Sequence, residues 1–457
     1  MKTNFLILFL LSILMTSAQL PMVERLDSLF TNMQLDNEFN GVVLVARNDT
    51  ILLEKAYGFS SFSTQEPLKL ESVFDLASVS KQFTAMGIVQ LQKQGKLNYE
   101  DTAVKYIPEL KNYPEVTIHQ LLTHTSGLPD YMSFMDELWD KSKYATNADV
   151  LLLLEQQNIE AEFEPGTAYN YSNTGYLALA SIIEKASNMS FGEYLDQTIF
   201  KPLGLKNTTV HRSRYAPKKI NHLTTGHVTK PEDGSIIAVD EMGMDFFMIY
   251  LDGIVGDGMV NTTINDLYLW TESLSTNKII NDEDREDIFT NYTTTTGENI
   301  NYGYGFQVNE KPLYGKHIAH SGGWAGYSTY MEKHLDKDLT FLFLQNVSLV
   351  STRMPVGSIR KILYNQPLEQ MATTEYSESN LEALVGEFKN AEIGMNITTF
   401  IQDMVLMAQA TGQGAFPLSG YKDYNFKFKP ADITITFSED RSELYLKQGP
   451  YTTTFKK

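Results

Sequence analysis

The chain has 457 residues, enough for two or three domains that each bury a full core. Apolar residues make up 42% and aromatic residues 12%, which excludes a disordered protein. The net charge of −19 argues against a nucleic-acid-binding protein, which needs a basic face, and the absence of cysteine excludes thiolate catalysis, disulfides and cysteine-ligated metals.

The first residues predict a secretory signal peptide. Lys2 precedes an apolar run over residues 5–15, and small residues follow over 16–18. We expect cleavage after Ala18 and export to the periplasm or the extracellular space. The alternative is an uncleaved anchor, but the run is short for a membrane span, and no later stretch reaches spanning length. The mature chain is therefore expected to be soluble, without a stable membrane span.

The next elements mix helix and strand patterns. Residues 22–36 have the apolar spacing of a helix, and residues 39–61 read as two strands around the turn Asn48-Asp49. From Phe74 the chain is first strand-like and then helical as far as Gly95, a plausible helix stop. We place the start of this helix close to Ser78.

Residues 100–290 are mostly helical in pattern. Thr117 is a candidate cap with Gly127 as the stop, residues 173–188 form an amphipathic pattern, and Thr262 or Thr263 precedes another helix. From about residue 302 four strand patterns follow as a meander, and residues 355–364 are again helical.

Strands at both ends with helices between them predict an α+β domain whose antiparallel sheet gathers both chain ends. After it, the polar stretch 366–380 is typical of a linker. Residues 381–457 alternate apolar and polar side chains, which predicts a small antiparallel β domain with one buried face. The expected organisation is therefore a signal peptide over 1–18, a domain over 19–365, the linker and the β domain.

A serine lies three residues before a lysine at one strand-to-helix junction. The spacing Ser-x-x-Lys alone is weak, because it occurs four times, at Ser78/Lys81, Ser275/Lys278, Ser358/Lys361 and Ser419/Lys422. Only Ser78 follows a strand-like segment and opens a long helix. There Lys81 would share a helix face with Ser78, and unpaired backbone N–H groups would favour a nearby oxyanion. The alternative is a capping serine beside a solvated lysine.

Two later segments carry further candidates. Tyr171-Ser172-Asn173 follows a Pro-Gly turn and precedes a helix, so a loop there can aim a phenol and an amide at a cleft. His320, Ser321, Gly322 and Gly323 lie on a predicted strand, where glycine often marks the close approach of another backbone or a ligand. The alternatives are a packed surface tyrosine and a β-bulge.

In this order, the three motifs resemble those of the penicillin-recognising serine hydrolases. The likeness is to the branch of class C β-lactamases, DD-peptidases and esterases, with its Tyr-x-Asn second motif and Lys/His-Thr/Ser-Gly third motif. The segments LLTHTSGLPDY, PGTAYNYSNTGY and HSGGWAGY also match family segments, and the resemblance covers roughly residues 22–365. It implies a β-lactamase/transpeptidase-like fold, and the C-terminal domain resembles small barrel-like domains appended to some members.

The resemblance implies a role for each matched residue. Ser78 would attack an acyl carbon, with Lys81 and Tyr171 as shared general base. Asn173 would hold Lys81 or a substrate amide. The N–H groups of Ser78 and Gly323 would form the oxyanion hole, in which one lost donor costs about 2.7–4 kcal/mol. His320 and Ser321, followed by Gly322, would face a substrate carboxylate or the proton relay.

One departure concerns His320, where β-lactamases of this branch usually carry lysine. A histidine of ordinary pKa is mostly neutral at pH 7, so an anionic β-lactam should be held less well. The histidines form no His-Glu-x-x-His signature, and the glycine-rich stretch over 253–260 lacks the ending of a phosphate loop. We expect no metal and no cofactor, and His124 is expected to have a structural role.

The sequence thus predicts an exported serine hydrolase that forms an acyl-enzyme on Ser78. Its substrate would be a small molecule or peptide, and a D-amino-acid peptide or small ester is favoured over a β-lactam. The alternative is a non-catalytic penicillin-binding-like protein that binds peptidoglycan-type peptides. Specificity is expected in the loops over 131–160 and 211–255. The C-terminal domain could gate the cleft or only add stability, and the sequence leaves the oligomeric state open.

Overall fold

The computed structural model describes most of the chain. The described residues are 21–230, 234–349, 351–368, 374, 376–390, 394–402, 404–411, 413–428, 431, 433–448 and 451–457. The predicted signal peptide over residues 1–18 lies outside them, as does part of the predicted linker.

A six-stranded antiparallel sheet gathers segments from both ends of the larger unit, and this confirms the predicted fold class. The strand order is β10-β11-β12-β13-β1-β2. The bounds are β1 Gly41–Arg47, β2 Thr50–Tyr57, β10 Gln307–Lys311, β11 Gly315–Trp324, β12 Tyr327–His334 and β13 Leu339–Gln345. Every residue of β13 is buried, because helices cover both faces of the sheet.

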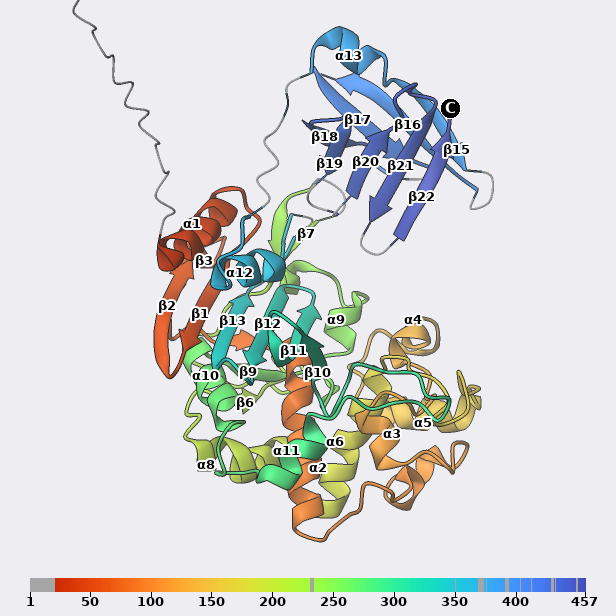
Figure 1. The fold of residues 1–457 in the computed structure, drawn as a ribbon. Coiled ribbons are helices and arrows are strands. Elements are labelled where there is room, and N and C mark those ends of the chain that lie inside the picture. Colours follow the sequence, from red (N-terminus) through yellow and green to blue (C-terminus); the bar gives the residue numbers. More distant parts are fainter. Residues whose placement is uncertain are drawn as a thin grey trace, which may run out of the picture.

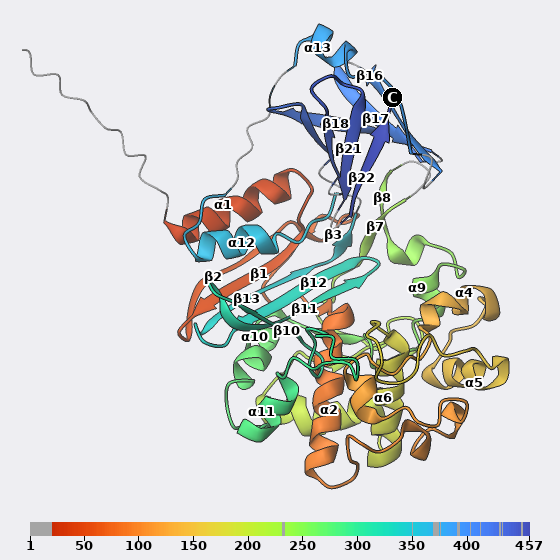
Figure 2. The ribbon, with the colours of Figure 1, turned by 45° about the vertical axis from the view of Figure 1, so that its right-hand side comes forward.

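Helices α1 (Met22–Leu35) and α12 (Val356–Leu363) lie on one face of the sheet (Figure 2). Phe30 of α1, Phe341 of β13 and Ile359 of α12 belong to the core between these layers. The first and last helices of this unit therefore pack beside each other, as the sheet order requires.

A buried ion pair joins β12 to α12. Both carboxylate oxygens of Glu332 accept hydrogen bonds from Arg360, at 2.6 and 2.8 Å, and Nε2 of His334 lies 2.7 Å from Oε1. Burial alone would raise the pKa of the Glu332 carboxyl, but its contacts with His334 and Arg360 lower the pKa to about 2. Glu332 is therefore ionised across the neutral range.

The other face of the sheet is covered by a helical region (Figure 1). Its helices are α2 (Lys81–Lys93), α3 (Ile118–Leu122), α4 (Met135–Leu138), α5 (Asn147–Gln157), α6 (Asn173–Ser187), α7 (Phe191–Leu195), α8 (Lys201–Leu203), α9 (Phe247–Tyr250), α10 (Ile264–Ser273) and α11 (Asp282–Ile288). The 3-10 turns are η1 (Ala77–Ser80), η2 (Ala103–Lys105), η3 (Pro108–Leu110), η4 (Tyr131–Ser133) and η6 (Val239–Glu241), and η5 (Asp196–Phe200) is a π-helical turn. Short strands are β3 (Phe59–Ser61), β4 (Glu66–Pro67), β5 (Phe74–Asp75), β6 (Thr209–Val210), β7 (His227–Thr229), β8 (Ile236–Ala238), β9 (Val260–Thr262) and β14 (Val347–Ser348).

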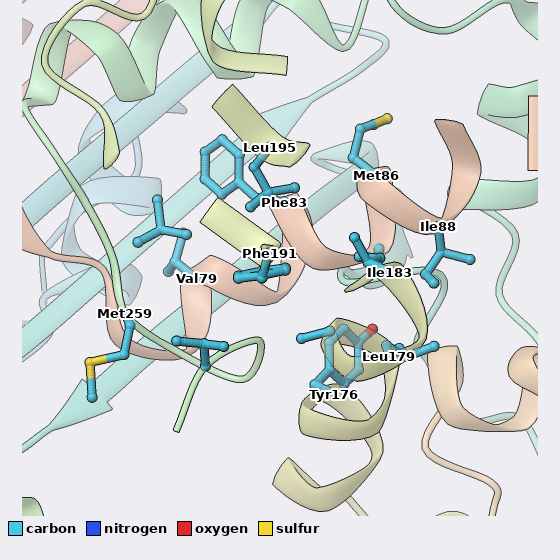
Figure 3. Close-up of a cluster of buried hydrophobic side chains, with 14 of the residues drawn as sticks. Val79, Phe83, Met86, Ile88, Tyr176, Leu179, Ile183, Phe191, Leu195 and Met259 are labelled. Carbon is cyan, nitrogen blue, oxygen red and sulfur yellow. The ribbon is translucent and has the colours of Figure 1, made fainter. Parts of the chain in front are cut away.

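Helix α2 runs through the centre of this region and is buried on all sides over residues 81–89. Phe83 and Met86 belong to a core shared with Leu179 and Ile183 of α6 (Figure 3). A Cβ atom on Gly87 would lie 2.7 Å from Ile183 Cδ1, so glycine lets α2 and α6 approach closely. A helix held this way gives its first residue, Lys81, a fixed position.

The predicted caps are largely confirmed. Thr117 caps α3 through a capping box, and Thr263 accepts a hydrogen bond from the Asp266 N–H at the start of α10. Helix α3 ends at Leu122 instead of continuing to Gly127, because His124 adopts a left-handed backbone conformation with φ 59°.

The C-terminal strands form a closed antiparallel barrel, which confirms the predicted small β domain. They are β15 (Gly386–Asn390), β16 (Met395–Gln402), β17 (Val405–Ala410), β18 (Phe416–Tyr421), β19 (Asn425–Phe428), β20 (Ile433–Phe437), β21 (Glu443–Gln448) and β22 (Tyr451–Lys456), preceded by α13 (Glu378–Glu382). Alternate residues such as Ile433, Ile435 and Phe437 fill its core. In Figures 1 and 2 the barrel lies at the end of the molecule away from α2 and α6.

Candidate active site

Ser78 lies in a strained turn before helix α2, not within the helix. Strand β5 ends at Asp75, and the 3-10 turn η1 spans Ala77–Ser80, so α2 begins only at Lys81. Ala77 has a left-handed φ of 48° and donates its N–H to Asp75 Oδ1 at 2.7 Å. A non-glycine residue in this region costs about 1–2 kcal/mol. Ser78 follows directly and lines a cavity.

Lys81 is fully buried, which excludes the solvated lysine considered from the sequence. Its Nζ lies 3.2 Å from Ser78 Oγ, 2.9 Å from Asn173 Oδ1 and 2.9 Å from the carbonyl oxygen of Asp257. The three donors of an ammonium group thus each have an acceptor. In the uncharged amine, two N–H bonds can remain with Asn173 and Asp257 while the lone pair faces the Ser78 hydroxyl. The same contact therefore suits proton transfer in both directions.

Tyr171 and Asn173 reach this lysine from the start of helix α6. Asn173 is the first residue of α6, and its N–H donates to Asp130 Oδ2 at 2.6 Å. The Tyr171 ring centroid lies 4.9 Å from Lys81 Nζ, and Tyr171 lines the same cavity as Ser78. The buried Tyr171 hydroxyl has no hydrogen-bonding partner among the described residues. It is therefore free to bond to a reacting group.

His124 supports Tyr171 from behind. Its Nδ1 accepts a hydrogen bond from the N–H of Ser172 at 3.0 Å, and its ring lies 4.3 Å from the Tyr171 ring, centroid to centroid, at an angle of 34°. Burial, followed by the nearby charge of Lys81, lowers the pKa of His124 well below its usual value. His124 is thus a neutral positioning residue, in keeping with the structural role expected from the sequence.

Strand β11 brings Gly322 and Gly323 against the nucleophile turn. A Cβ atom on Gly322 would lie 2.2 Å from the Leu76 carbonyl oxygen and 2.2 Å from Thr329 Oγ1, so only glycine fits there. Gly323 follows and lines the cavity together with Ser78. The contact at Gly322 thus fixes the Gly323 backbone relative to Ser78.

His320 and Ser321 do not line the cavity. His320 is buried behind Tyr171, with 6.1 Å between the ring centroids. Its Nδ1 donates to the Ser321 carbonyl oxygen at 2.7 Å, and its Nε2 accepts from the Tyr302 hydroxyl at 2.8 Å. Burial, together with the charge of Lys81, lowers the pKa of His320 to about 3. His320 is therefore neutral and offers no charge to a substrate.

The cavity encloses about 460 Å³, and much of its wall comes from segments without a sequence motif. Its apolar lining residues include Met132, Phe247, Leu251, Ile254, Met259 and Trp324. Tyr131 and Asp257 also line it, with the Tyr131 hydroxyl donating to Asp257 Oδ2 at 2.7 Å. The loops over 131–160 and 211–255, expected to set specificity, both contribute residues.

Over the described residues, the chain lacks the features of two other classes of protein. No group of three or more histidine, aspartate and glutamate side chains in this part of the chain is arranged to hold a metal ion. None of the helices that the structure describes has the length and apolar character needed to cross a membrane.

Comparisons with known proteins place the chain among relatives. The family model described as Beta-lactamase matches residues 26–366. A penicillin-binding protein of Bacillus subtilis (strain 168) is 39% identical over 323 residues, which cover 71% of each chain. The octameric penicillin-binding protein homologue from Pyrococcus abyssi covers 95% of this chain and 100% of its own, with a TM-score of 0.67 and 22% identity. The D-amino acid amidase from Ochrobactrum anthropi SV3 covers 75% of this chain and 99% of its own, with a TM-score of 0.62 and 20% identity. At these identities, the two solved structures establish a shared fold only.

Proposed function

Since this chain belongs to the Beta-lactamase family of serine hydrolases, we propose that it cleaves an amide or ester bond through an acyl-enzyme on Ser78. The observation that carries the proposal is the contact of the buried Lys81 Nζ with Ser78 Oγ at 3.2 Å. A serine becomes a nucleophile when an adjacent base takes its proton. Asn173 accepts a hydrogen bond from Lys81, and the centroid of the Tyr171 ring lies 4.9 Å from the Lys81 Nζ, so both residues lie against the lysine.

In the acylation step, Ser78 Oγ forms a bond to the substrate's carbonyl carbon and gives its proton to the Lys81 amine. The bond from that carbon to the leaving nitrogen or oxygen breaks, and the leaving group takes the proton through Tyr171 or Lys81. Water then attacks the acyl carbon and loses its proton to the same base. The bond from that carbon to Ser78 Oγ breaks, Oγ takes the proton back from the base, and the acid product leaves. The N–H groups of Ser78 and Gly323 would hold the oxyanion in both steps.

For the substrate, we propose a D-amino-acid peptide, amide or small ester in preference to a β-lactam. The neutral state of His320 supports this choice, because an anionic β-lactam would meet no positive charge at the third motif. The amidase among the structural neighbours acts on amides, by its name, and shares the fold. The Bacillus subtilis relative is by its name a penicillin-binding protein, which supports binding of penicillin. Efficient cephalosporin hydrolysis at pH 7.5 would contradict this substrate choice.

The chain is further proposed to be exported, and the basic, apolar and small residues of the first 18 positions support this. Expression in a bacterial host followed by N-terminal sequencing of the secreted protein tests it. The expected mature sequence begins at Gln19. A retained, full-length N-terminus on a membrane-bound product would point instead to an anchor.

Active-site labelling tests the catalytic proposal. The protein is treated with a fluorophosphonate and, separately, with a fluorescent penicillin, and the modified peptide is mapped by mass spectrometry. We expect the fluorophosphonate on Ser78, and loss of the label in Ser78→Ala. The matched control is Ser275→Ala, which changes an exposed serine of the same Ser-x-x-Lys spacing and should keep the label. Labelling by neither probe would favour the non-catalytic binding protein.

A further inference from the structure

The wall of the active-site cavity carries acidic but no basic side chains. Among the described residues that line it, Asp75 and Asp257 are acidic, and none is a lysine, arginine or histidine. Lys81 lies outside the lining, and its donors already have three acceptors. A positively charged substrate group therefore meets opposite charge in this cavity, whereas a carboxylate meets repulsion.

Asp75 has one carboxylate oxygen that makes no described hydrogen bond. Its side chain is 8% exposed, and Oδ1 accepts the Ala77 N–H, but Oδ2 has no hydrogen-bonding partner in the described part of the chain. Burial is the main cause that raises the pKa of Asp75, and the charges of Asp252 and Asp257 add to it. With the opposing effects of the Ala77 N–H and Arg214 included, the pKa is about 7. A buried carboxylate without a partner is destabilised in its ionised form, and a cationic group beside it removes this penalty.

The neighbouring charged groups are already engaged. Asp257 accepts the Tyr131 hydroxyl through Oδ2, and Arg214 forms ion pairs with Asp240 and Asp252. No described ion pair joins Arg214 to Asp75, so the arginine leaves the Asp75 carboxylate unpaired. Asp75 thus has a carboxylate oxygen on this wall that is free to receive a ligand.

Asp75 also lies at the junction of two cavities. It lines the cavity that holds Ser78 and an adjoining one of about 150 Å³, and both also include Trp324 and Ala325 in their walls. Asp75 precedes Ser78 by three residues, which limits their Cα–Cα distance to about 11 Å. A carboxylate on the nucleophile's own segment suits a group attached close to the attacked carbonyl, such as an α-ammonium group.

We propose that Asp75 binds the free α-ammonium group of the substrate, and that the site takes amides or esters of apolar amino acids with an unblocked amino group. The apolar residues Phe247, Leu251 and Ile254 of the same cavity would receive the side chain. This inference rests on the proposed hydrolase function. The inference assigns a positive charge to the substrate and names Asp75 as the residue that binds it.

The test compares leucine p-nitroanilide with its N-acetyl derivative, in D and L forms, at pH 7.5. For the unmodified protein, we expect kcat/KM to be about 10- to 100-fold higher for the free amine of the preferred enantiomer, as expected for a hydrogen bond between charged groups. Asp75→Asn, which keeps an acceptor for the Ala77 N–H, should abolish most of this preference through a rise in KM. The matched control Asp240→Asn removes the same charge from a largely exposed side chain and should keep the preference within about twofold.

The outcomes separate this inference from the proposed function. If the fluorophosphonate labels Ser78 but the unmodified protein accepts the N-acetyl substrate equally well or better, the assignment of Asp75 is wrong and the hydrolase proposal stands. An unchanged preference in a folded Asp75→Asn protein would also overturn the assignment. If Ser78 is not labelled, the proposed function fails and this inference fails with it. The comparison on the unmodified protein remains decisive even if Asp75→Asn does not fold.

Discussion

The contact between Gly322 and the nucleophile segment can be tested by adding a single methyl group in Gly322→Ala. The new Cβ atom would lie 2.2 Å from the Leu76 carbonyl oxygen, where contacts between real atoms begin at about 3.0 Å. Strand β11 and the Ser78 segment must therefore separate by about 0.8 Å. Because Leu76 O is a backbone atom, the shift cannot be absorbed by rotating a side chain.

The expected effects follow from that displacement. A misplacement of about 1 Å at catalytic groups costs about 10²-fold in rate, and the loss of one oxyanion donor costs about 10²- to 10³-fold. Overpacking of this kind lowers the free energy of unfolding by about 1–3 kcal/mol. We expect kcat/KM for p-nitrophenyl acetate to fall about 100-fold in a protein that still folds.

The assay measures ester hydrolysis and thermal unfolding side by side. The matched control is Gly357→Ala on helix α12, where an added Cβ has no atom within 4 Å. This control should retain activity and stability. Activity of Gly322→Ala within about threefold of the unmodified protein would refute the idea that this contact sets the geometry at Ser78.

Three further predictions concern single side chains. Lys81→Met should lower kcat about 10²- to 10⁴-fold in the ester assay because it removes the base beside Ser78, and a loss below tenfold would reject that role. Tyr171→Phe should lower kcat by a comparable factor without loss of thermal stability, because the hydroxyl has no partner to lose among the described residues; a lower melting temperature with full activity would show a purely structural role. For Glu332, the lowered pKa of about 2 against an ordinary 4.5 corresponds to about 3 kcal/mol of stability, which is present above pH 4.5 and lost as the pH falls through 2. In urea unfolding, the difference between the unmodified protein and Glu332→Gln should therefore shrink as the pH falls from 7 to 2, and a constant difference would contradict the linkage.

The sequence predicted the sheet well, because its strands either alternate apolar and polar residues or are apolar throughout, and clear turns separate them. It also brought Ser78, Lys81 and Tyr171 into one hypothesis by the order of three motifs. It could not place the start of helix α2, because the left-handed backbone of Ala77 is imposed by the Asp75 contact and the β11 strand packed against it.

Asp75 and Asp257 carried no recognisable local signature in the sequence. Their position on the cavity wall arises from contacts between segments about 180 residues apart, such as the carbonyl of Asp257 on Lys81. The sequence also could not predict on which side of β11 the His320 side chain lies, because the alternation of side chains along a strand does not indicate which face borders the cavity. Tertiary packing determines these features, and they leave no periodic pattern in a single sequence.

The catalytic side and the apolar side of the cavity are built from different elements, and this affects how the substrate specificity of the fold can change. The turn η1, the start of helix α2 and strand β11 carry the nucleophile, the lysine and Gly323. The apolar residues Met132, Phe247 and Leu251 come from the turn η4, helix α9 and the residue after it. Mutational drift in those segments can exchange one acyl group for another while the reacting atoms keep their places. Few mutations are therefore needed to change the substrate specificity of this architecture, whereas a change of the reaction itself would require changes in its central elements.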